Sequence, residues 1–156
     1  GSGTGSIAIE IAKRSGQIQV YAVEKKPLAL ELIKKNIEKF ALPNIYVIEG
    51  EAPDCLMEEN RKETPTHALI GGSSGRLKEI LDALYEKNKT MRVVIDAISL
   101  ETISEIAMLK KDDRITNLEI ISVQVSRAKQ IGEYQLMQGE NPIYICSFDF
   151  MERKDQ

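Results

Sequence analysis

The sequence is short of the side chains from which most metal and redox sites are built. It holds one histidine, two cysteines and no tryptophan in 156 residues. A single histidine, His67, leaves no room for a histidine-based metal site, and Cys55 and Cys146 lack the spacing of a metal or redox motif. We therefore expect no metal ion, a reduced cytoplasmic protein, a buried thiol at Cys146 and a strand-edge position for His67.

Long apolar runs and an excess of positive charge are also absent. No apolar segment approaches the roughly 20 residues that span a bilayer, and no signal peptide is visible. The net charge is −3, whereas a domain that binds nucleic acid generally carries a basic face. We therefore expect neither a membrane nor a nucleic acid as a partner.

What is present begins at the first residue. The chain opens with Gly1-Ser2-Gly3-Thr4-Gly5-Ser6, a helical pattern follows, and an apolar run over 18–23 ends on Glu24. Glycines let the backbone turn tightly and approach a ligand, and a carboxylate about 20 residues later can accept hydrogen bonds from both ribose hydroxyls. The third glycine is Gly5 rather than residue 6. That spacing departs from the dinucleotide fingerprint and resembles the S-adenosylmethionine loop of Rossmann-like methyltransferases.

Strand and helix patterns alternate along most of the chain, which predicts an α/β domain with a mostly parallel sheet. Residues 27–41 read as an amphipathic helix whose apolar stripe consists of Leu28, Leu32, Ile33, Ile37 and Phe40. We expect further helices over 76–87 and 100–110, the second capped by Ser99 or Thr102. Strands are expected over 45–48, 67–70 and 92–98, with a polar helix or loop over 54–63.

The last third of the chain changes character. Residues 118–126 and 143–150 alternate in polarity without a helical pattern between them, which predicts an antiparallel pair joined by a loop. A parallel sheet that closes with an antiparallel hairpin is the Rossmann-like methyltransferase arrangement rather than the dehydrogenase one. We expect one domain over 1–156 that lacks the central strand preceding a glycine loop in this fold, and therefore has two unpaired strand edges.

Unusual residues collect where the predicted strands end, and ligands bind beyond the carboxyl ends of an open α/β sheet. We expect Glu51 to accept the adenine amino proton, or the Ala52 backbone to bond the ring edge, and Gly71 to pass beside the methionine moiety. The predicted cofactor-binding residues are Gly1, Ser2, Gly3, Thr4, Gly5, Glu24, Lys25, Glu51, Ala52 and Gly71.

Five segments together carry a more specific resemblance. They are Gly50-Glu51-Ala52-Pro53, Ile70-Gly71-Gly72-Ser73-Ser74-Gly75, Leu100-Glu101-Thr102, Ser126-Arg127-Ala128 and Asn141-Pro142-Ile143-Tyr144. In their order and spacing they resemble the decarboxylating precorrin methyltransferases of cobalamin biosynthesis, over essentially the whole chain. The resemblance implies S-adenosylmethionine as cofactor, methylation of a precorrin or cobalt-precorrin and removal of the carboxylate from its ring C acetate side chain. It also implies a homo-oligomer, with a tetramer as the expected size, and a second precorrin methyltransferase domain as a fused or separate partner.

A precorrin carries many carboxylates while this chain is net acidic, so the cations that bind it must be local. Arg127 and Lys129 lie in the predicted loop between the last two strands, and arginine suits bidentate carboxylate binding. The predicted acceptor-binding residues are Gly72, Ser73, Gly75, Arg127 and Asn141. The candidates for proton transfer during decarboxylation are Ser73, Ser74, Asp96 and Tyr134, and the sequence does not rank them.

Two other functions stay open at this point. One is a methyltransferase that acts on another small molecule or on RNA. Against an RNA acceptor, the chain has Gly-Gly-Ser-Ser where amino-methylases of nucleic acids usually carry an Asn- or Asp-Pro-Pro-aromatic motif. The other is a non-catalytic oligomerisation or regulatory module with the same fold, from which measured cofactor binding would distinguish an enzyme.

Overall fold

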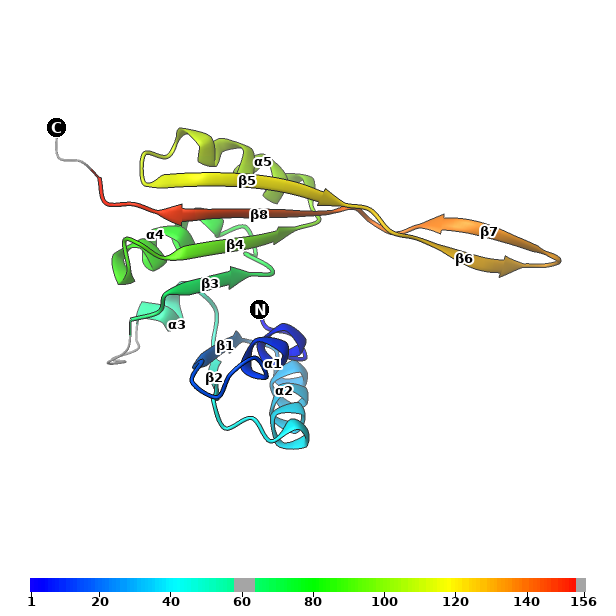
Figure 1. Ribbon diagram of the computed structural model, residues 1–156, viewed down its shortest axis with the longest axis horizontal. Coiled ribbons are helices and arrows are strands. Elements are labelled where there is room, and N and C mark those ends of the chain that lie inside the picture. Colours follow the sequence, from blue (N-terminus) through cyan, green and yellow to red (C-terminus); the bar gives the residue numbers. More distant parts are fainter. Residues whose placement is uncertain (58–63, 154–156) are drawn as a thin grey trace. The chain divides into compact units, whose positions relative to one another are not determined.

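A computed structural model describes residues 1–57 and 64–153 and divides the chain into two compact units (Figure 1). The first unit is Gly1–Lys62 and the second is Glu63–Gln156. Each unit is described below by itself, and the single domain expected from the sequence stays a prediction. Among the described residues, no helix is long and apolar enough to cross a membrane.

The first unit packs two helices on a two-stranded parallel sheet. In chain order it contains α1 (Ser6–Ala12), β1 (Val20–Glu24), α2 (Pro27–Phe40), β2 (Ile45–Glu49) and the short α3 (Asp54–Met57). β1 and β2 pair in register from Val20↔Ile45 to Glu24↔Glu49, so both strands end together on a glutamate. The buried core of this unit consists of Ala8, Ile9, Ala12, Ala22, Ile33 and Ile45.

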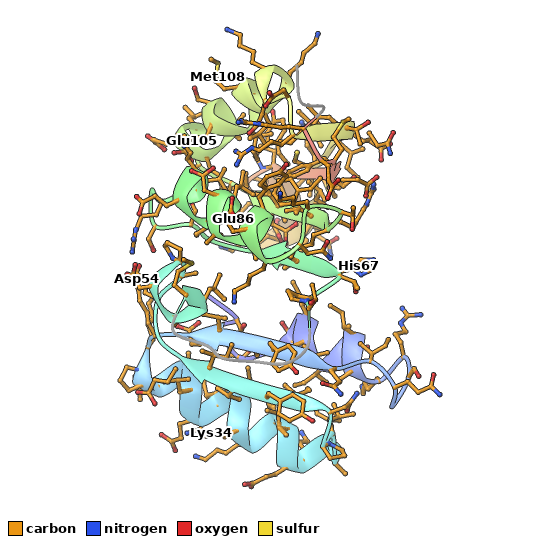
Figure 2. The ribbon with its side chains drawn as sticks, turned by 90° about the vertical axis from the view of Figure 1, so that its left-hand side faces the viewer. Lys34, Asp54, His67, Glu86, Glu105 and Met108 are labelled. Atoms are coloured by element: carbon orange, nitrogen blue, oxygen red, sulfur yellow. The ribbon has the colours of Figure 1, made fainter. Side chains whose placement is uncertain are left out.

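Helix α2 forms as predicted, with Pro27 in its first turn, but its buried stripe lies on other residues. Leu30 and Ile33 are buried, whereas Leu28 is 78% exposed. The inward positions follow the spacing Leu30, Ile33 and Ile37, and both Ile33 and Ile37 pack on the core of the unit. The predicted stripe was wrong at Leu28, Leu32 and Phe40, which are all exposed, because apolar residues fill more than one face of the helix. Lys34 lies on the outer side (Figure 2).

A buried asparagine joins the end of α1 to the start of β1. The Asn44 side-chain amide donates hydrogen bonds to the carbonyl oxygens of Ala12, Ser15 and Ile18 at 3.1, 3.3 and 2.8 Å. Ala12 is the last residue of α1, where backbone acceptors lack intrahelical partners, and Ser15 and Ile18 follow in the connection to β1. Asn44 therefore sets the path by which the chain enters β1.

The second unit is a four-stranded sheet with two helices and a projecting hairpin (Figure 1). Its elements are β3 (His67–Ile70), α4 (Leu77–Lys87), β4 (Arg92–Ala97), α5 (Leu100–Met108), the short 3-10 helix η1 (Leu109–Lys111), β5 (Ile115–Val123), β6 (Ser126–Ile131), β7 (Tyr134–Gly139) and β8 (Ile143–Phe150). The strand order is β3-β4-β8-β5. β3 and β4 are parallel and β8 is antiparallel to both β4 and β5, which confirms the predicted antiparallel closure.

One face of this sheet is buried and the other is more open. Val93, Ile95, Cys146 and Phe148 are 0% exposed and share the buried face. The helices contribute buried residues of their own, among them Leu77 and Leu81 of α4 and Ile106 of α5. Ser99 caps α5, since the Thr102 backbone N–H donates to its hydroxyl at 3.3 Å. Burial raises the pKa of the Cys146 thiol to about 11, which confirms the buried thiol.

The segment expected to be a loop between the last two long strands is instead a β-hairpin, so that prediction was wrong. β6 and β7 pair antiparallel from Ser126↔Gly139 to Ile131↔Tyr134 around a two-residue turn. Gly132 in this turn has a φ of +61°, a conformation that glycine adopts at little cost. Every residue of both strands is exposed, so the hairpin has no core of its own.

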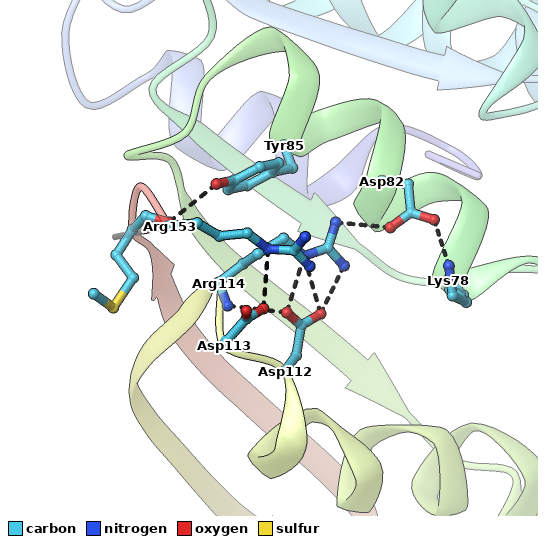
Figure 3. A network of polar contacts seen from close by, with 8 residues as sticks. Lys78, Asp82, Tyr85, Asp112, Asp113, Arg114 and Arg153 are labelled. Atoms are coloured by element: carbon cyan, nitrogen blue, oxygen red, sulfur yellow. Dashed lines mark hydrogen bonds and ion pairs between the residues drawn. The ribbon is translucent and has the colours of Figure 1, made fainter. Parts of the chain in front are cut away.

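A polar network holds the start of β5 to α4 (Figure 3). Arg114 pairs with Asp112 at 2.6 Å and with Asp82 at 2.8 Å, and its guanidinium lies 5.0 Å from the centre of the Tyr85 ring. Hydrogen bonding to Arg114 lowers the pKa of the Asp112 carboxyl. The network joins residues that flank the edge of the sheet, and we assign it a structural role.

Candidate functional site

The glycine loop runs along the end of β1. The Ser2 backbone N–H donates to the Val23 carbonyl oxygen at 2.8 Å, and the Gly3 N–H donates to Glu24 Oε2 at 2.8 Å. From α2, the Asn36 amide donates to the Thr4 carbonyl oxygen at 3.0 Å. The loop is therefore held by backbone, carboxylate and amide partners, and sequence reasoning missed Asn36, since nothing in its spacing set it apart from the polar face of α2.

Gly5 could not be replaced by a larger residue without displacing α2. Its φ is +80°, and a Cβ at this position would lie 2.4 Å from Cγ1 of the buried Ile33. Gly3 also has a positive φ, of +55°, but a Cβ there would meet nothing within 4 Å. The loop thus uses Gly3 for backbone conformation alone and Gly5 for both conformation and close packing against α2.

Glu24 is the centre of this arrangement. Its side chain is almost fully buried, with only 4% of the residue exposed, and Oε1 accepts hydrogen bonds from the Lys25 and Lys26 backbone N–H groups at 2.9 Å each. Burial alone would raise the pKa of Glu24, but the backbone N–H groups of Lys26, Gly3 and Lys25 bring it below its ordinary value. The carboxylate is therefore ionised at neutral pH.

The residues at Glu24 fit a nucleoside. A carboxylate offers about four lone-pair positions, and three are used by backbone N–H groups, which leaves acceptor capacity on Oε2. A Cβ on Gly1 would lie 3.3 Å from that oxygen, so the absence of a side chain keeps the approach to Oε2 open. A ribose hydroxyl can be accepted there, as the S-adenosylmethionine prediction requires.

The end of β2 adds the remaining predicted residues of the first unit. The Gly50 N–H donates to the Glu24 carbonyl oxygen at 2.9 Å, and Gly50 has a φ of +151° because the chain turns sharply there. A Cβ on Gly50 would lie 2.7 Å from Cβ of Cys55. Lys25 forms an ion pair with Glu51. The structure thus collects the glycine loop, Glu24, Lys25 and Glu51-Ala52 at one edge of the β1–β2 sheet.

In the second unit, the glycine-serine segment follows β3. Ser73 is buried, whereas Ser74 and Gly75 have φ values of +52° and +78°, and the Arg76 N–H donates to the Ser73 carbonyl oxygen at 2.9 Å. These dihedrals make a tight turn into α4. Gly71 belongs to this unit while the other predicted cofactor residues belong to the first, so its role in cofactor binding stays a prediction.

The predicted acceptor and proton-transfer residues do not all gather in one place. Arg127 and Asn141 lie at the base of the hairpin, where Arg127 pairs with Glu140 across the strands. Arg127 also lines a shallow hollow with Ala128, Lys129, Gln138, Gly139 and Glu140. Tyr134 begins β7 at the far tip of the hairpin and is 73% exposed (Figure 1). Asp96 lies instead in β4.

Comparisons with known proteins agree with this geometry. A family model described as the precorrin methyltransferase domain matches residues 1–149. The chain is 39% identical over 150 residues to a cobalt-precorrin-6B C(15)-methyltransferase (decarboxylating) of Saccharolobus solfataricus, covering 94% of this chain and 74% of that protein.

Two solved structures are also similar. Precorrin-6y C5,15-methyltransferase of Geobacter metallireducens gives a TM-score of 0.82 at 29% identity, over 96% of this chain and 77% of that one. Precorrin-8W decarboxylase of Methanobacterium thermoautotrophicum gives 0.76 at 28% identity, over 95% and 77%.

Proposed function

Because this chain belongs to the precorrin methyltransferase family, we propose that it methylates a precorrin-type tetrapyrrole at carbon and decarboxylates an acetate side chain of the same substrate. Its cofactor is S-adenosylmethionine. The name of the curated relative gives cobalt-precorrin-6B as substrate and C15 as position, and we propose both here. The single observation that carries the proposal is the buried, ionised Glu24 carboxylate, which the Gly3 N–H ties to the glycine loop.

Methyl transfer depends more on how the protein positions the methyl donor and the acceptor carbon than on acid or base groups. When bound, S-adenosylmethionine supplies a methyl group on a positively charged sulfur, which a carbon nucleophile in line with it can accept. Glu24 would accept hydrogen bonds from the ribose hydroxyls, and Glu51 or the Ala52 backbone would contact the adenine. The shortage of histidine and reactive cysteine side chains agrees with such a reaction.

Decarboxylation consumes one proton. The bond between the acetate methylene and its carboxylate breaks, carbon dioxide leaves, and the electron pair left on the methylene carbon takes up a proton. Ser73, Ser74, Asp96 and Tyr134 are the candidate donors; Tyr134 fits least, because it is exposed at the tip of the hairpin.

We propose that the tetrapyrrole binds at the carboxyl edge of the sheet of the second unit. Three features support this place. The Gly72–Gly75 turn follows β3 there and its backbone N–H groups can bind an anion. β8 runs antiparallel to β4, so β8 begins at the edge where β4 ends. Arg127 and Asn141 therefore emerge at the same edge as that turn.

The direct test is turnover by the full chain. Cobalt-precorrin-6B and S-adenosylmethionine should give a product that carries one more methyl group and has lost one carboxyl group as carbon dioxide, with release of S-adenosylhomocysteine in equal amount. Glu49→Ala, on the strand next to Glu24 and exposed, serves as the control variant. A chain that binds S-adenosylhomocysteine but never changes the mass of the tetrapyrrole would overturn the proposal.

We further propose a homo-oligomer assembled through the β6–β7 hairpin. Ile131, Tyr134, Leu136 and Met137 are 53%, 73%, 52% and 68% exposed. An isolated two-stranded hairpin is marginally stable in water, and clustered exposed apolar residues are a common mark of an interface. Light scattering at tens of micromolar should show more than a monomer, with a tetramer as the expected size; a monomer alone would contradict this.

Two finer statements complete the proposal. The chain acts in the cytoplasm, which its two buried cysteines, neither of them in a disulfide, support. It works with a second precorrin methyltransferase domain, fused or separate, because the name of the Geobacter relative covers two positions, C5 and C15. Co-purification with a C5-methylating partner would test the second statement.

A further inference from the structure

Asp96 occupies a special place at the carboxyl edge of the second unit's sheet. It is the next-to-last residue of β4 and is half-buried. On one side it pairs with Ile145 of β8. On the other side Ile70 of β3 pairs with Ile95, so Gly71 follows at the level of Asp96. The carboxyl group therefore belongs to a strand end that the glycine-serine turn flanks directly.

Among the described residues, Asp96 has neither a hydrogen-bond nor an ion-pair partner. The other described aspartates of this unit are paired: Asp149 with Arg92, Asp82 and Asp112 with Arg114, and Asp113 with Arg153. Burial, with no cation to offset it, raises the pKa of the Asp96 carboxyl. In the ligand-free protein, a half-buried acid without a partner is destabilising. Such acids are common in binding sites, where the ligand supplies the partner.

The charged groups around Asp96 do not neutralise the negative charge of its carboxylate. Because side chains alternate along a strand, Asp96 shares its face of the sheet with Arg92, His67 and Asp149 at the opposite end, and with Glu119 of β5, which pairs with Ser147. Four residue steps along the strand separate Arg92 from Asp96, which is about 13 Å. Glu119 carries the same charge as an ionised Asp96. From α5, Glu101 and Glu105 are the acidic groups, and that helix packs with the residues of the other, buried face. Nothing among these groups neutralises an ionised Asp96.

We propose that Asp96 binds the acceptor by donating the hydrogen of its carboxyl group to a carboxylate of the tetrapyrrole. This rests on the proposed function, which supplies a polycarboxylic ligand at the same edge as Gly71 and the base of the hairpin. The ligand then supplies a partner to an acid that has none within residues 1–57 and 64–153. Asp96 complements Arg127, which reaches the same class of group as a cation but is already paired with Glu140.

In this proposal Asp96 binds the ligand in its neutral, protonated form. An ordinary aspartate contact would instead use the ionised carboxylate as an acceptor. Asparagine has nearly the same shape and keeps a donor at every pH. Asp96→Asn should therefore bind the acceptor well and lose the pH dependence that Asp96 confers. As the pH rises, the wild-type carboxyl ionises and repels the ligand carboxylate, so only the wild type weakens through this group.

The experiment measures binding of uroporphyrin I, a tetrapyrrole with eight carboxyl groups, to the full chain saturated with S-adenosylhomocysteine. Binding is measured over a pH series. At its acid end, where the Asp96 carboxyl is neutral, Asp96→Ala should bind about tenfold more weakly than the wild type and Asp96→Asn about equally. As the pH rises and the carboxyl ionises, Asp96→Asn should bind increasingly more tightly than the wild type, up to about tenfold. Taking the ratio of the two proteins at each pH cancels the titration of the porphyrin itself. Glu86→Gln, an exposed acid on α4, should match the wild type throughout (Figure 2).

The outcomes separate this inference from the function on which it rests. If the wild type turns over cobalt-precorrin-6B but shares its pH profile with Asp96→Asn, the inference fails and the function stands. The same holds if Asp96→Ala binds as the wild type does. If the wild type binds S-adenosylhomocysteine but neither uroporphyrin nor a precorrin, both fail. Should Asp96→Ala not fold, the comparison of wild type with Asp96→Asn decides by itself.

Discussion

The glycine loop of the first unit and the hairpin of the second, which both belong to the proposed site, differ in how firmly the rest of their unit holds them. The loop is held by Glu24, Asn36 and the end of β1, and Gly5 packs directly on Ile33. The hairpin consists of two strands that are exposed throughout, with one ion pair at its base. The glycine loop is thus organised before a ligand arrives, whereas we propose that another copy of the chain covers the hairpin.

The largest effect should come from the place where the loop is packed most tightly. Gly5→Ala places a Cβ 2.4 Å from Ile33 Cγ1 at a φ of +80°, so we expect it to lower the free energy of unfolding by about 2–5 kcal/mol. Thermal and urea unfolding measure this. Gly3→Ala is the matched control, with a positive φ but open space, and should cost about 1–2 kcal/mol. Equal costs would mean that the contact with Ile33 does not matter.

Removing the central carboxylate should act on cofactor affinity. Glu24→Ala leaves the Gly3, Lys25 and Lys26 N–H groups and the ribose hydroxyls without their acceptor, so binding of S-adenosylhomocysteine should weaken by about 1–3 kcal/mol. Calorimetry measures it, with Glu49→Ala as control on the neighbouring strand. Unchanged affinity in a variant that folds would remove Glu24 from the site.

The same carboxylate makes the stability of the glycine loop depend on pH. The pKa of Glu24 is lower in the folded protein than its ordinary value of 4.5, so its stabilising contribution is complete above that value. It is lost as the pH falls from there through the folded pKa. Hydrogen exchange at Gly3 should therefore speed up at low pH in the wild type, relative to Glu24→Gln at the same pH. A constant ratio would show that ionised Glu24 does not hold the loop.

A smaller effect is expected at the base of the hairpin. Arg127 is exposed and paired with Glu140, so Arg127→Ala should lower kcat/KM for the tetrapyrrole by about threefold to tenfold and spare cofactor affinity. Arg127→Lys should restore part of the loss, because a point charge cannot replace a bidentate fork. If both variants turn over as the wild type does, Arg127 is a surface charge and the acceptor binds elsewhere.

The smallest effect on the monomer should come from the tip of the hairpin. Leu136→Ser removes an apolar side chain that is half exposed, so the unfolding free energy of the isolated chain should change by less than about 0.5 kcal/mol. Assembly should respond instead, with light scattering showing a shift towards monomer. Gln135→Ser, a polar-to-polar change at the preceding position of β7, is the control. A loss of stability without a change in assembly would contradict the role given to the hairpin.

Sequence patterns predicted most of the fold because local signals agreed with tertiary packing. Proline at the start of α2, the Ser99 cap and strand β8 all appeared where expected, and β5 pairs with β8 as predicted but lies over Ile115–Val123 rather than 118–126. Prediction was wrong at Leu28, Leu32 and Phe40, because α2 carries apolar residues on more than one face. It was also wrong over the hairpin. There we expected a loop, although the segment carries the Gly132-Glu133 turn between two strands that pair residue by residue.

The amino-acid sequence by itself determined the family, the glycine loop and Glu24 as its carboxylate, since these depend on residue types at short spacing. The tertiary structure alone decided what those residues do for one another. It showed that Glu24 holds the loop through Gly3, that Ile33 requires glycine at Gly5, and that Asp96, near the end of β4, has no hydrogen-bond or ion-pair partner among the described residues. The reason is physical: burial, hydrogen-bond satisfaction and close approach are relations between residues far apart in the chain, and only packing brings them together.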